Sequence, residues 1–451
     1  MDTPICDFVK QYQEKNPVRL HMPGHKGRGF SGAEKWDITE IPGADELFHP
    51  QGIILKSEEN AASLFGAGKT LYSTEGSSLC IRAMVFLALL FGRERGREPV
   101  ILAGRNAHKT FLSAAALLDV QVEWLFPETE SGLMACPLTA AGLERALQSL
   151  PHPPCAVYVT SPDYLGNLTD IAALSRVCRK REILLLVDNA HGAYLRFLPQ
   201  DQHPLSQGAD LCCDSAHKTL PALTGAAYLH LGKNAPACCF QNARRAMALF
   251  ASTSPSYLIL QSLDQCNAYL SGSFPQRLST LSARLEEMKD RLREKGFSLA
   301  GGEKTKITLV PKAFGYTGNE LHQRIRNQGV EGEFSDPDYL TLMFSPSLDE
   351  KELERTEKAL LSIPRKAPIL QAPPPLPRPR QALSIRRAML SLSRETPVQD
   401  AAGSILSDAL VSCPPCVPIV CCGEIIDDAA ISCFLYYGLP SCRVVEEAGL
   451  G

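Results

Sequence analysis

Two short stretches of this sequence place reactive side chains directly after strand-like runs. Lys218 lies in DSAHKTL, which follows the run ADLCC, and Asp188 lies in DNAHGA, which follows the run EILLLV. His191 stands three residues after Asp188. If both runs are strands of a parallel sheet, these groups lie at carboxyl ends of strands, where such sheets bind ligands. The lysine amine could form an imine, the carboxylate could stabilise a positive charge on a ligand, and the imidazole could transfer a proton.

These groups match the chemical needs of pyridoxal phosphate. A lysine must form an imine with the aldehyde of that cofactor, and a carboxylate must keep its pyridine nitrogen protonated so that the ring accepts electrons from a substrate carbanion. Lys218 and Asp188 would fill these roles. The phosphate needs backbone N–H groups at a helix N-terminus and hydroxyl donors, which EGSS at 75–78 and Ser215 can supply. His108, in RNAHKT, is placed to stack on the ring.

Taken singly, each of these residues has a more ordinary explanation. Most lysines are solvated surface charges, and an aspartate at a strand end is commonly a cap or turn residue. A histidine such as His108 or His191 is usually a satisfied polar side chain, and Gly-Ser-Ser is a common helix start. Only the order of these residues and their shared place after strands favour a cofactor site.

The elements that would position them alternate along the chain. From about residue 60 to residue 235, the runs PVILA, VQVEWLF, CAVYVT, EILLLVD, ADLCC and GAAYLHL are separated by helical patterns, which predicts an α/β fold with a mainly parallel sheet. A long amphipathic helix is expected over 275–295. We predict an N-terminal segment at 1–55, a large cofactor-binding domain at 56–265, a helical and small α/β segment at 266–365, a proline-rich linker at 366–382 and a small C-terminal α/β domain at 383–451.

The composition is that of an ordinary soluble protein. Hydrophobic residues make up 45% of the 451 residues, charged residues make up 21%, and the net charge of −3 gives no reason to expect nucleic acid. The N-terminus lacks the apolar core of a secretory signal, and the apolar stretch 83–91 is too short to span a bilayer, so we expect a cytoplasmic protein. Sixteen irregularly placed cysteines favour reduced, mostly buried thiols.

An ordered set of motifs resembles the ornithine/lysine/arginine decarboxylase family, in its compact form without an N-terminal wing domain. The motifs run over nearly the whole chain: HMPGHKGRG, DITEIPGADELFHP, FGAGKTLYSTEGSS, RNAHKT, VTSPDYLGN, VDNAHGAY, DSAHKTLPALTG, STSPSYLILQSLD, GYTGNELHQRIRNQGVEGEFSD and PPCVPIVCCGE. Such a series is far more specific than any single motif.

The resemblance implies the aspartate aminotransferase fold, with active sites at the interface of a homodimer or higher homo-oligomer. It implies Lys218 as the imine lysine, Asp188 at the pyridine nitrogen and His108 over the ring. Ala190 would pack on the other face of the ring, and His191 would lie close to the reacting substrate. The phosphate would be bound by Gly76, Ser77, Ser78, Ser215 and His217.

The implied reaction is decarboxylation of arginine, lysine or ornithine to CO2 and the corresponding amine of the polyamine pathway. Lys218 would exchange with the substrate amino group, and Lys218 or His191 would donate the proton at the reacting carbon. A long cationic side chain needs an acidic partner. The candidates are Asp45, Glu46, Glu333 and Asp336, although an ordinary solvated acid is the more common explanation for any one of them.

Several positions depart from the family pattern. Asn189 replaces the glutamate of the usual DEAHG, and Glu75 stands where an asparagine usually precedes the phosphate-loop glycine. A carboxylate 4 Å from the phosphate would repel it by about 4 kcal/mol per unit charge at an effective dielectric near 20. Cys416 and Cys422 replace a glycine and a proline. Two alternatives therefore stay open: another reaction of the same cofactor, such as amino transfer, or a catalytically impaired binding or regulatory homologue.

Two further motifs do not carry a function. GAGKT resembles the end of a nucleotide-binding P-loop, but that pattern requires glycine at position 63, which is Ser63. CPPC at 413–416 has no following histidine and no second CxxC, so we predict no metal site there.

Overall fold

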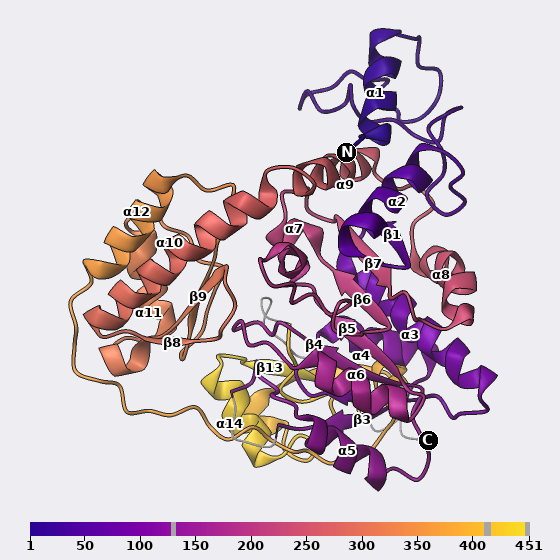
Figure 1. Ribbon diagram of the computed structural model, residues 1–451. Coiled ribbons are helices and arrows are strands. Elements are labelled where there is room, and N and C mark those ends of the chain that lie inside the picture. Colours follow the sequence, from indigo (N-terminus) through magenta and orange to yellow (C-terminus); the bar gives the residue numbers. More distant parts are fainter. Residues whose placement is uncertain (128–131, 410–415, 447–451) are drawn as a thin grey trace. The chain divides into compact units, whose positions relative to one another are not determined.

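The computed structural model describes residues 1–127, 132–409 and 416–446, and these form two compact units (Figure 1). The first unit contains residues 1–98, 151–161 and 171–279, and the second contains residues 99–150, 162–170 and 280–451. The last residue of CPPC, Cys416, is described, whereas 413–415 lie outside the described residues.

The first unit is built on five strands in the order β1-β7-β6-β5-β4. Strand β5 pairs in parallel with β4 and β6, whereas β7 is antiparallel to both β6 and β1. The strands are β1 (Lys69–Ser73), β4 (Ala156–Thr160), β5 (Leu184–Asp188), β6 (Leu211–Asp214) and β7 (Ala227–Leu231). Every residue of β5, β6 and β7 is buried, as expected for apolar runs covered on both faces.

Helices of the first unit cover this sheet and connect its strands. They are α1 (Pro4–Glu14), α2 (Ile53–Phe65), α3 (Gly76–Glu94), α6 (Ile171–Lys180), α7 (Ala216–Thr219), α8 (Ala237–Phe250) and α9 (Tyr257–Leu270), with a 3-10 turn at η1 (Ala193–Phe197). Helix α3 is long and apolar enough to cross a membrane by length and composition, but most of its apolar stretch is buried within the protein. It packs on α8, β6 and β7 as a core helix.

The second unit contains a parallel strand pair and two antiparallel sheets. Strand β2 (Val100–Gly104) pairs in parallel with β3 (Gln121–Leu125). The larger antiparallel sheet has the order β10-β11-β9-β8, formed by β8 (Ser298–Ala300), β9 (Lys306–Val310), β10 (Phe334–Ser335) and β11 (Leu340–Met343). The smaller sheet pairs β12 (Ser393–Pro397) with β13 (Ser441–Val445).

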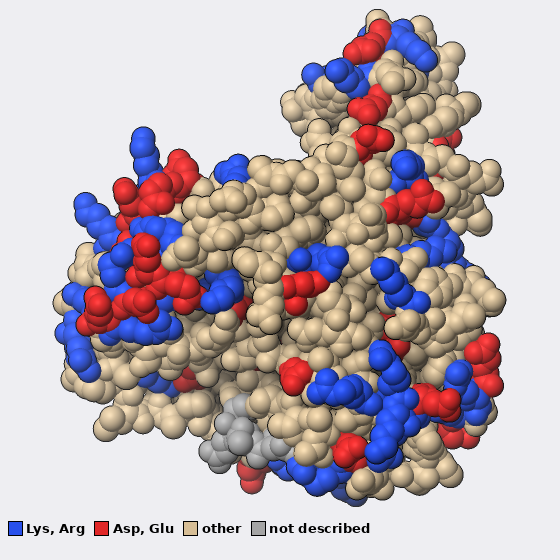
Figure 2. Space-filling model, viewed as in Figure 1, with Lys and Arg blue, Asp and Glu red and all other residues tan. Residues whose placement is uncertain are grey.

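The helices of the second unit are α4 (Lys109–Leu118), α5 (Ala140–Ser149), α11 (Gly318–Arg326), α12 (Glu350–Leu361), α13 (Ile385–Leu390) and α14 (Asp428–Tyr436), with 3-10 turns at η2 (Pro311–Phe314) and η3 (Val398–Asp400). The predicted amphipathic helix is α10 (Phe274–Lys295), most of which lies in this unit. On the face shown in Figure 2, acidic and basic side chains intermix over α10 and α12, where Arg284 and Arg291 both pair with Glu357. Residues 366–380 form neither helix nor strand.

A buried ion pair links two parts of the second unit that are far apart in the sequence. The Arg105 guanidinium, at the end of β2, donates to a Glu424 carboxylate oxygen at 2.8 Å and to the Ile419 carbonyl at 3.1 Å, and it also contacts the Cys421 thiol. The side chains of Arg105 and Glu424 are only 8% and 2% exposed. Cys416 has a φ of 60°, a backbone region that favours glycine, which is the residue that the resemblance implies at this position.

All fifteen cysteines in the described ranges are free thiols, and all except the half-buried Cys6 are buried. The expectation that these cysteines are mostly buried is thus confirmed for that part of the chain. Burial raises the pKa of most of them; for example, the pKa of the Cys421 thiol reaches about 12 despite the nearby Arg105. These cysteines therefore act as small apolar side chains.

The first prediction concerns the Arg105–Glu424 pair. Removing one partner of a buried ion pair leaves an uncompensated charge, which costs about 3–5 kcal/mol. We expect Glu424→Ala to lower the free energy of unfolding by that amount in urea denaturation. The matched control is Glu331→Ala, because Glu331 is 67% exposed in its pairs with His322 and Arg326 and should cost less than about 1 kcal/mol. Equal losses for the two variants would contradict the prediction.

The second prediction concerns Asp163, which is 4% exposed in the turn of the SPDYLGN motif. Its carboxylate accepts hydrogen bonds from the Leu165 and Asn167 backbone N–H groups and from the Asn167 amide. Burial nevertheless raises the pKa of Asp163 from 3.8 to about 6. The folded state therefore binds this proton more tightly than the unfolded state, so this group lowers stability as pH rises from about 4 to about 6.

Asp163→Asn should remove this pH-dependent loss of stability, because an amide at position 163 does not titrate. It can keep its hydrogen bonds if the Asn167 side-chain amide rotates by 180° so that its oxygen accepts from the new NH2 group. We expect the variant to gain stability relative to the wild type through the window from pH 4 to pH 6, by up to about 3 kcal/mol. Urea midpoints measured at intervals across this window test the sign. Parallel curves for the two proteins would show that Asp163 does not titrate there.

Candidate active site

Strand β5 ends on Asp188, which is 2% exposed. One carboxylate oxygen accepts a hydrogen bond from the Tyr158 hydroxyl at 3.0 Å, and the other accepts from the Ala190 backbone N–H at 3.1 Å and from the Cys213 thiol at 3.5 Å. A carboxylate can accept about four hydrogen bonds. Asp188 is therefore held in a fixed orientation and still has capacity for a further donor.

The turn after β6 carries the candidate lysine on the short helix α7. The Nζ atom of Lys218 lies 3.1 Å from Nε2 of His191, and its backbone N–H donates to the Ser215 carbonyl. Because β5 and β6 pair in parallel, with Asp188 opposite Cys213, the loops that follow them leave the same edge of the sheet. The structure thus brings Lys218 and His191 together, beside the strand end that holds Asp188.

The candidate phosphate loop lies at the start of α3. Gly76 has a φ of 69°, and its N–H donates to the Gly225 carbonyl at 2.7 Å. Ser77 and Ser78 follow in the first turn, where backbone N–H groups point out of the helix end. The Ser215 hydroxyl donates to the Ser77 hydroxyl at 2.8 Å, which joins the two loops that the sequence suggested for the phosphate.

Glu75 is engaged elsewhere. It is exposed, it makes no side-chain cap to α3, and its carboxylate accepts a hydrogen bond from the Ser252 backbone N–H at 2.7 Å. A carboxylate held in this way does not turn into the first turn of α3. The repulsion expected for a carboxylate aimed at a phosphate therefore does not apply in this arrangement.

Two further predicted residues flank the lysine and the carboxylate. Ala190 is buried, and its N–H fixes Asp188. His217 is half-buried, and its ring nitrogen Nδ1 lies 3.0 Å from the Ala226 carbonyl. Burial lowers the pKa of His217, and the nearby Lys218 lowers it further. A neutral imidazole at this position can donate only one ring N–H, and the Ala226 carbonyl is the acceptor beside it.

Sequence reasoning missed a buried polar cluster beneath these loops. Asp214 accepts from Asn189 at 2.6 Å and contacts Nε2 of both His203 and His230 at 3.0 and 3.2 Å, and all of these side chains are fully buried. Burial acts to raise the pKa of Asp214, but the two imidazoles outweigh it and hold the pKa well below its usual range. Burial lowers the pKa of His230. The irregular spacing of these residues gave no motif that could have revealed them.

His108 belongs to the second unit, where it caps α4. Its Nδ1 accepts a hydrogen bond from the Thr110 backbone N–H at 3.1 Å. The next residue, Lys109, donates its backbone N–H to the Cys416 carbonyl, and Arg105 is fixed by Glu424. The C-terminal segment therefore sets the conformation of the loop that carries His108. Its stacking on a cofactor ring stays a prediction.

The four acidic candidates for the substrate side chain differ in their surroundings. Asp45 accepts backbone hydrogen bonds from Gln51, Gly52 and Ile54, which outweigh burial and lower its pKa, so it caps the start of α2. The other three also have partners. Asp336 accepts from two backbone N–H groups of its own turn, Glu46 contacts His49, and Glu333 accepts from the Tyr164 hydroxyl at 2.7 Å.

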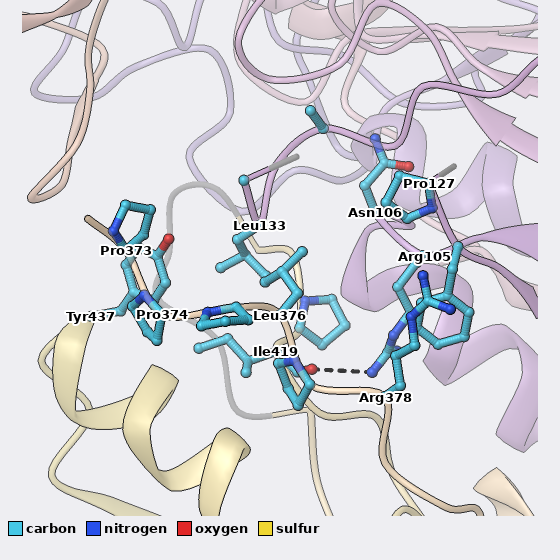
Figure 3. Close-up of a pocket in the computed structure, with 16 residues that line it drawn as sticks. Arg105, Asn106, Pro127, Leu133, Pro373, Pro374, Leu376, Arg378, Ile419 and Tyr437 are labelled. Carbon is cyan, nitrogen blue, oxygen red and sulfur yellow. Dashed lines mark hydrogen bonds between the residues drawn. The ribbon is translucent and has the colours of Figure 1, made fainter. Parts of the chain in front are cut away.

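The second unit has a cavity of about 440 Å³ that is separate from the predicted catalytic and cofactor-binding residues (Figure 3). Its wall includes Pro373, Pro374, Arg378, Ile419 and Tyr437. The dashed line in Figure 3 is the Arg105 hydrogen bond to the Ile419 carbonyl. No predicted site residue lines this cavity, so we assign no catalytic role to it.

The donor set of the first unit fits pyridoxal phosphate. The amine of Lys218 lies at the same sheet edge as a buried carboxylate with spare acceptor capacity, and two serine hydroxyls gather at the start of a long helix. These are the groups needed for the aldehyde, the ring nitrogen and the phosphate of that cofactor.

Comparisons with known proteins agree with this arrangement. The chain is 28% identical to "Arginine decarboxylase" of Bacillus subtilis over 96% of this chain and 92% of that protein. It is 25% identical to "Lysine decarboxylase LdcA" of Pseudomonas aeruginosa, over 60% of this chain and 40% of that protein. The structure of a Francisella novicida lysine decarboxylase superposes with a TM-score of 0.80, at 16% identity, covering 98% of this chain and 81% of that one.

The constitutive lysine decarboxylase of E. coli superposes with a TM-score of 0.76 at 18% identity, covering 99% of this chain and 82% of that one. These likenesses confirm the predicted α/β fold of the pyridoxal phosphate enzymes. The family model described as "Orn/Lys/Arg decarboxylase, major domain" matches residues 3–351. That match confirms the predicted enzyme class, a pyridoxal phosphate-dependent decarboxylase of basic amino acids. The chain belongs to the Orn/Lys/Arg decarboxylase family.

Proposed function

We propose that this chain decarboxylates arginine, releasing CO2 and the corresponding amine. The observation that carries the proposal is the contact of Lys218 Nζ with His191 Nε2 at 3.1 Å, beside the strand end that holds the buried Asp188. The choice of arginine is supported by the relatives. Those named arginine decarboxylase in Bacillus subtilis and Halalkalibacterium halodurans match over more than 90% of both chains, whereas the lysine-named relative from Pseudomonas aeruginosa matches over 60% of this chain.

Each of the three residues has a distinct role in this proposal. When bound, the cofactor supplies an aldehyde for amines and a ring that accepts electrons from the breaking bond to the carboxylate. Lys218 holds the cofactor and yields its place to the substrate amine. Asp188 keeps its negative charge against the pyridine nitrogen, where burial strengthens the attraction. His191 shares a proton with Lys218, so either group can deliver it to the reacting carbon.

The other predicted residues hold the cofactor in place. The hydroxyls of Ser77, Ser78 and Ser215 bind its phosphate, together with Gly76 and the first turn of α3. The single ring N–H of neutral His217 goes to the Ala226 carbonyl, so His217 would donate to the phosphate only after it takes up a second proton. Ala190 packs on one face of its ring, and stacking by His108 stays the prediction drawn from the family resemblance. Because Glu75 is bound to Ser252, one of the three features that suggested an impaired homologue does not weigh against this role.

We also propose a cytoplasmic homodimer that supplies an amine of the polyamine pathway. The free thiols of the described residues favour a reducing compartment. Large apolar side chains are exposed within one short stretch of the N-terminal segment, at Val18, Leu20, Met22 and Phe30, which supports a surface for a second copy of the chain.

The third prediction tests the role of Lys218. The purified protein with added pyridoxal phosphate should show the visible absorbance of a lysine-linked cofactor, and Lys218→Ala should lose it together with CO2 release. The matched control is Lys233→Ala, which changes an exposed lysine of the same unit and should keep both. Retention of the absorbance in Lys218→Ala would mean that another lysine holds the cofactor.

The fourth prediction concerns the substrate. Arginine, lysine and ornithine are supplied separately, and CO2 and amine are measured for each. We expect kcat/KM for arginine to exceed the other values by roughly tenfold or more. Acidic groups arranged to accept two parallel N–H donors of a guanidinium would have an unpaired acceptor when an ammonium binds instead. A preference for lysine or ornithine would overturn arginine as the substrate. Absence of CO2 with all three would overturn the decarboxylase itself.

A further inference from the structure

The side chains of Asp188 and Asn189 are adjacent in sequence but enter different environments. Asp188 contacts Tyr158 and Cys213. Asn189 donates its side-chain amide to Asp214, and its backbone N–H donates to the Cys213 carbonyl. The ends of β5 and β6 are thus tied together by two side-chain contacts, Asp188 with Cys213 and Asn189 with Asp214.

Asp214 is the centre of the lower contact. One of its carboxylate oxygens accepts from the Asn189 amide at 2.6 Å and from the Cys212 thiol at 3.6 Å. The other lies 3.0 Å from Nε2 of His203 and 3.2 Å from Nε2 of His230. Asp214 is fully buried, and a buried charge is tolerated only when it is hydrogen-bonded in this way.

The hydrogen-bond network defines which imidazole nitrogen carries a proton. Nδ1 of His203 accepts from the Leu205 backbone N–H at 3.3 Å, so its Nε2 is the donor to Asp214. Nδ1 of His230 lies 2.8 Å from the Thr70 hydroxyl, which can donate to it and leave Nε2–H for Asp214. Phe65 packs against both rings, with centroids 5.5 and 4.5 Å away, and closes the cluster.

This cluster gives a physical reason for the departure at position 189. In the usual DEAHG motif that position is a glutamate. An aspartate at 189, which has the size of Asn189, would face the Asp214 carboxylate at hydrogen-bond distance. The longer glutamate would bring its charge into the same fully buried surroundings, where two such charges repel strongly. The Asn189 amide instead donates to Asp214. Asn189 and Asp214 are therefore complementary to each other.

We propose that Asp214 is a positioning residue of the active site, which through Asn189 holds the Asp188 strand end in register with the turn that carries Ser215 and Lys218. This inference rests on the proposed function. Asp188 and Lys218 must act on one cofactor from two neighbouring strands, so their separation is set by how β5 and β6 end. In the family motif a glutamate at position 189 carries the negative charge. In this chain Asp214, at the end of the neighbouring strand β6, carries it.

A metal site formed by the same residues is the competing explanation. One ligand atom each of His203, Asp214 and His230 lies within 4.8 Å of the others. Hydrogen bonds account for all three of these atoms, for the outer nitrogens of both imidazoles and for the second oxygen of Asp214. The geometry is that of a hydrogen-bonded cluster in which Asp214 holds the two imidazoles and Asn189.

The test is to exchange the two side chains. Asn189→Asp places two carboxylates face to face, and Asp214→Asn removes the charge that the two imidazoles and Asn189 share. The double variant Asn189→Asp/Asp214→Asn restores the contact between positions 189 and 214 and the contacts with both imidazoles, because the amide introduced at position 214 accepts from the imidazoles with its oxygen and donates with its nitrogen to the carboxylate introduced at position 189. It gives up only the weak contact with the Cys212 thiol at 3.6 Å. The full-length proteins are compared in thermal unfolding without cofactor and in titration with pyridoxal phosphate.

Each single variant should lower the unfolding temperature and weaken cofactor affinity by about tenfold or more. The double variant should return to within about threefold of the wild type, as expected for two directly coupled side chains. The matched control is Asp264→Asn, a fully buried carboxylate of the same unit that accepts from Ser57 and the Ile5 backbone. It should lower the unfolding temperature while cofactor affinity and the visible absorbance maximum stay unchanged.

Three results would overturn the proposal. The first is a double variant no better than the worse single variant, since the two residues would then not be coupled. The second is an Asp214→Asn protein whose affinity and absorbance match those of Asp264→Asn, because Asp214 would then serve stability alone. The third is a stoichiometric metal ion in the wild type that Asp214→Asn loses. If the wild type binds no cofactor, the proposed function fails, whereas the unfolding comparison still measures the Asn189–Asp214 coupling.

Discussion

The parallel pairing of β5 with β6 is the constraint on which the candidate active site depends. Asp188 lies opposite Cys213 in this pairing, so the carboxylate and the lysine turn leave the sheet at the same edge. Neither strand could shift by one residue, because a slip would move every side chain to the other face of the sheet. The chemistry of Lys218 therefore depends on interactions that fix strand register, most of which lie away from the cofactor side chains.

Buried carboxylates supply many of the interactions that fix the strand register and the loops. Asp188, Asp214 and Glu424 are each 2% exposed or less, and each accepts hydrogen bonds from several donors. Such groups contribute modestly to net stability, but they allow few alternative arrangements, since any other arrangement would leave a buried charge unsatisfied. In the second unit, the Arg105–Glu424 pair fixes the loop before His108 in the same manner as the Asn189–Asp214 contact fixes the loop after Asp188.

Sequence patterns predicted the parts of the site that follow local rules. Apolar runs define β5 and β6, so Asp188 and Lys218 could be placed at strand ends, and Gly76 with Ser77 marks a helix start. The partners of these residues could not be predicted, because they come from distant positions. Glu75 binds Ser252, 177 residues away, and Arg105 binds Glu424, 319 residues away. No periodicity or spacing encodes such pairs, which arise only when the chain is folded.

The departures from the family motifs show why a single substituted position is weak evidence of lost function. Asn189 removes a charge from the DEAHG pattern, yet the fold places the Asp214 carboxylate against its amide. Glu75 adds a charge at the phosphate loop, yet a backbone N–H group holds that charge away from the helix start. Cys416 takes a backbone conformation that favours glycine, and its carbonyl still receives the Lys109 N–H. In each case the consequence of the substitution is decided by its neighbour in space, which argues for a working site rather than a decayed one.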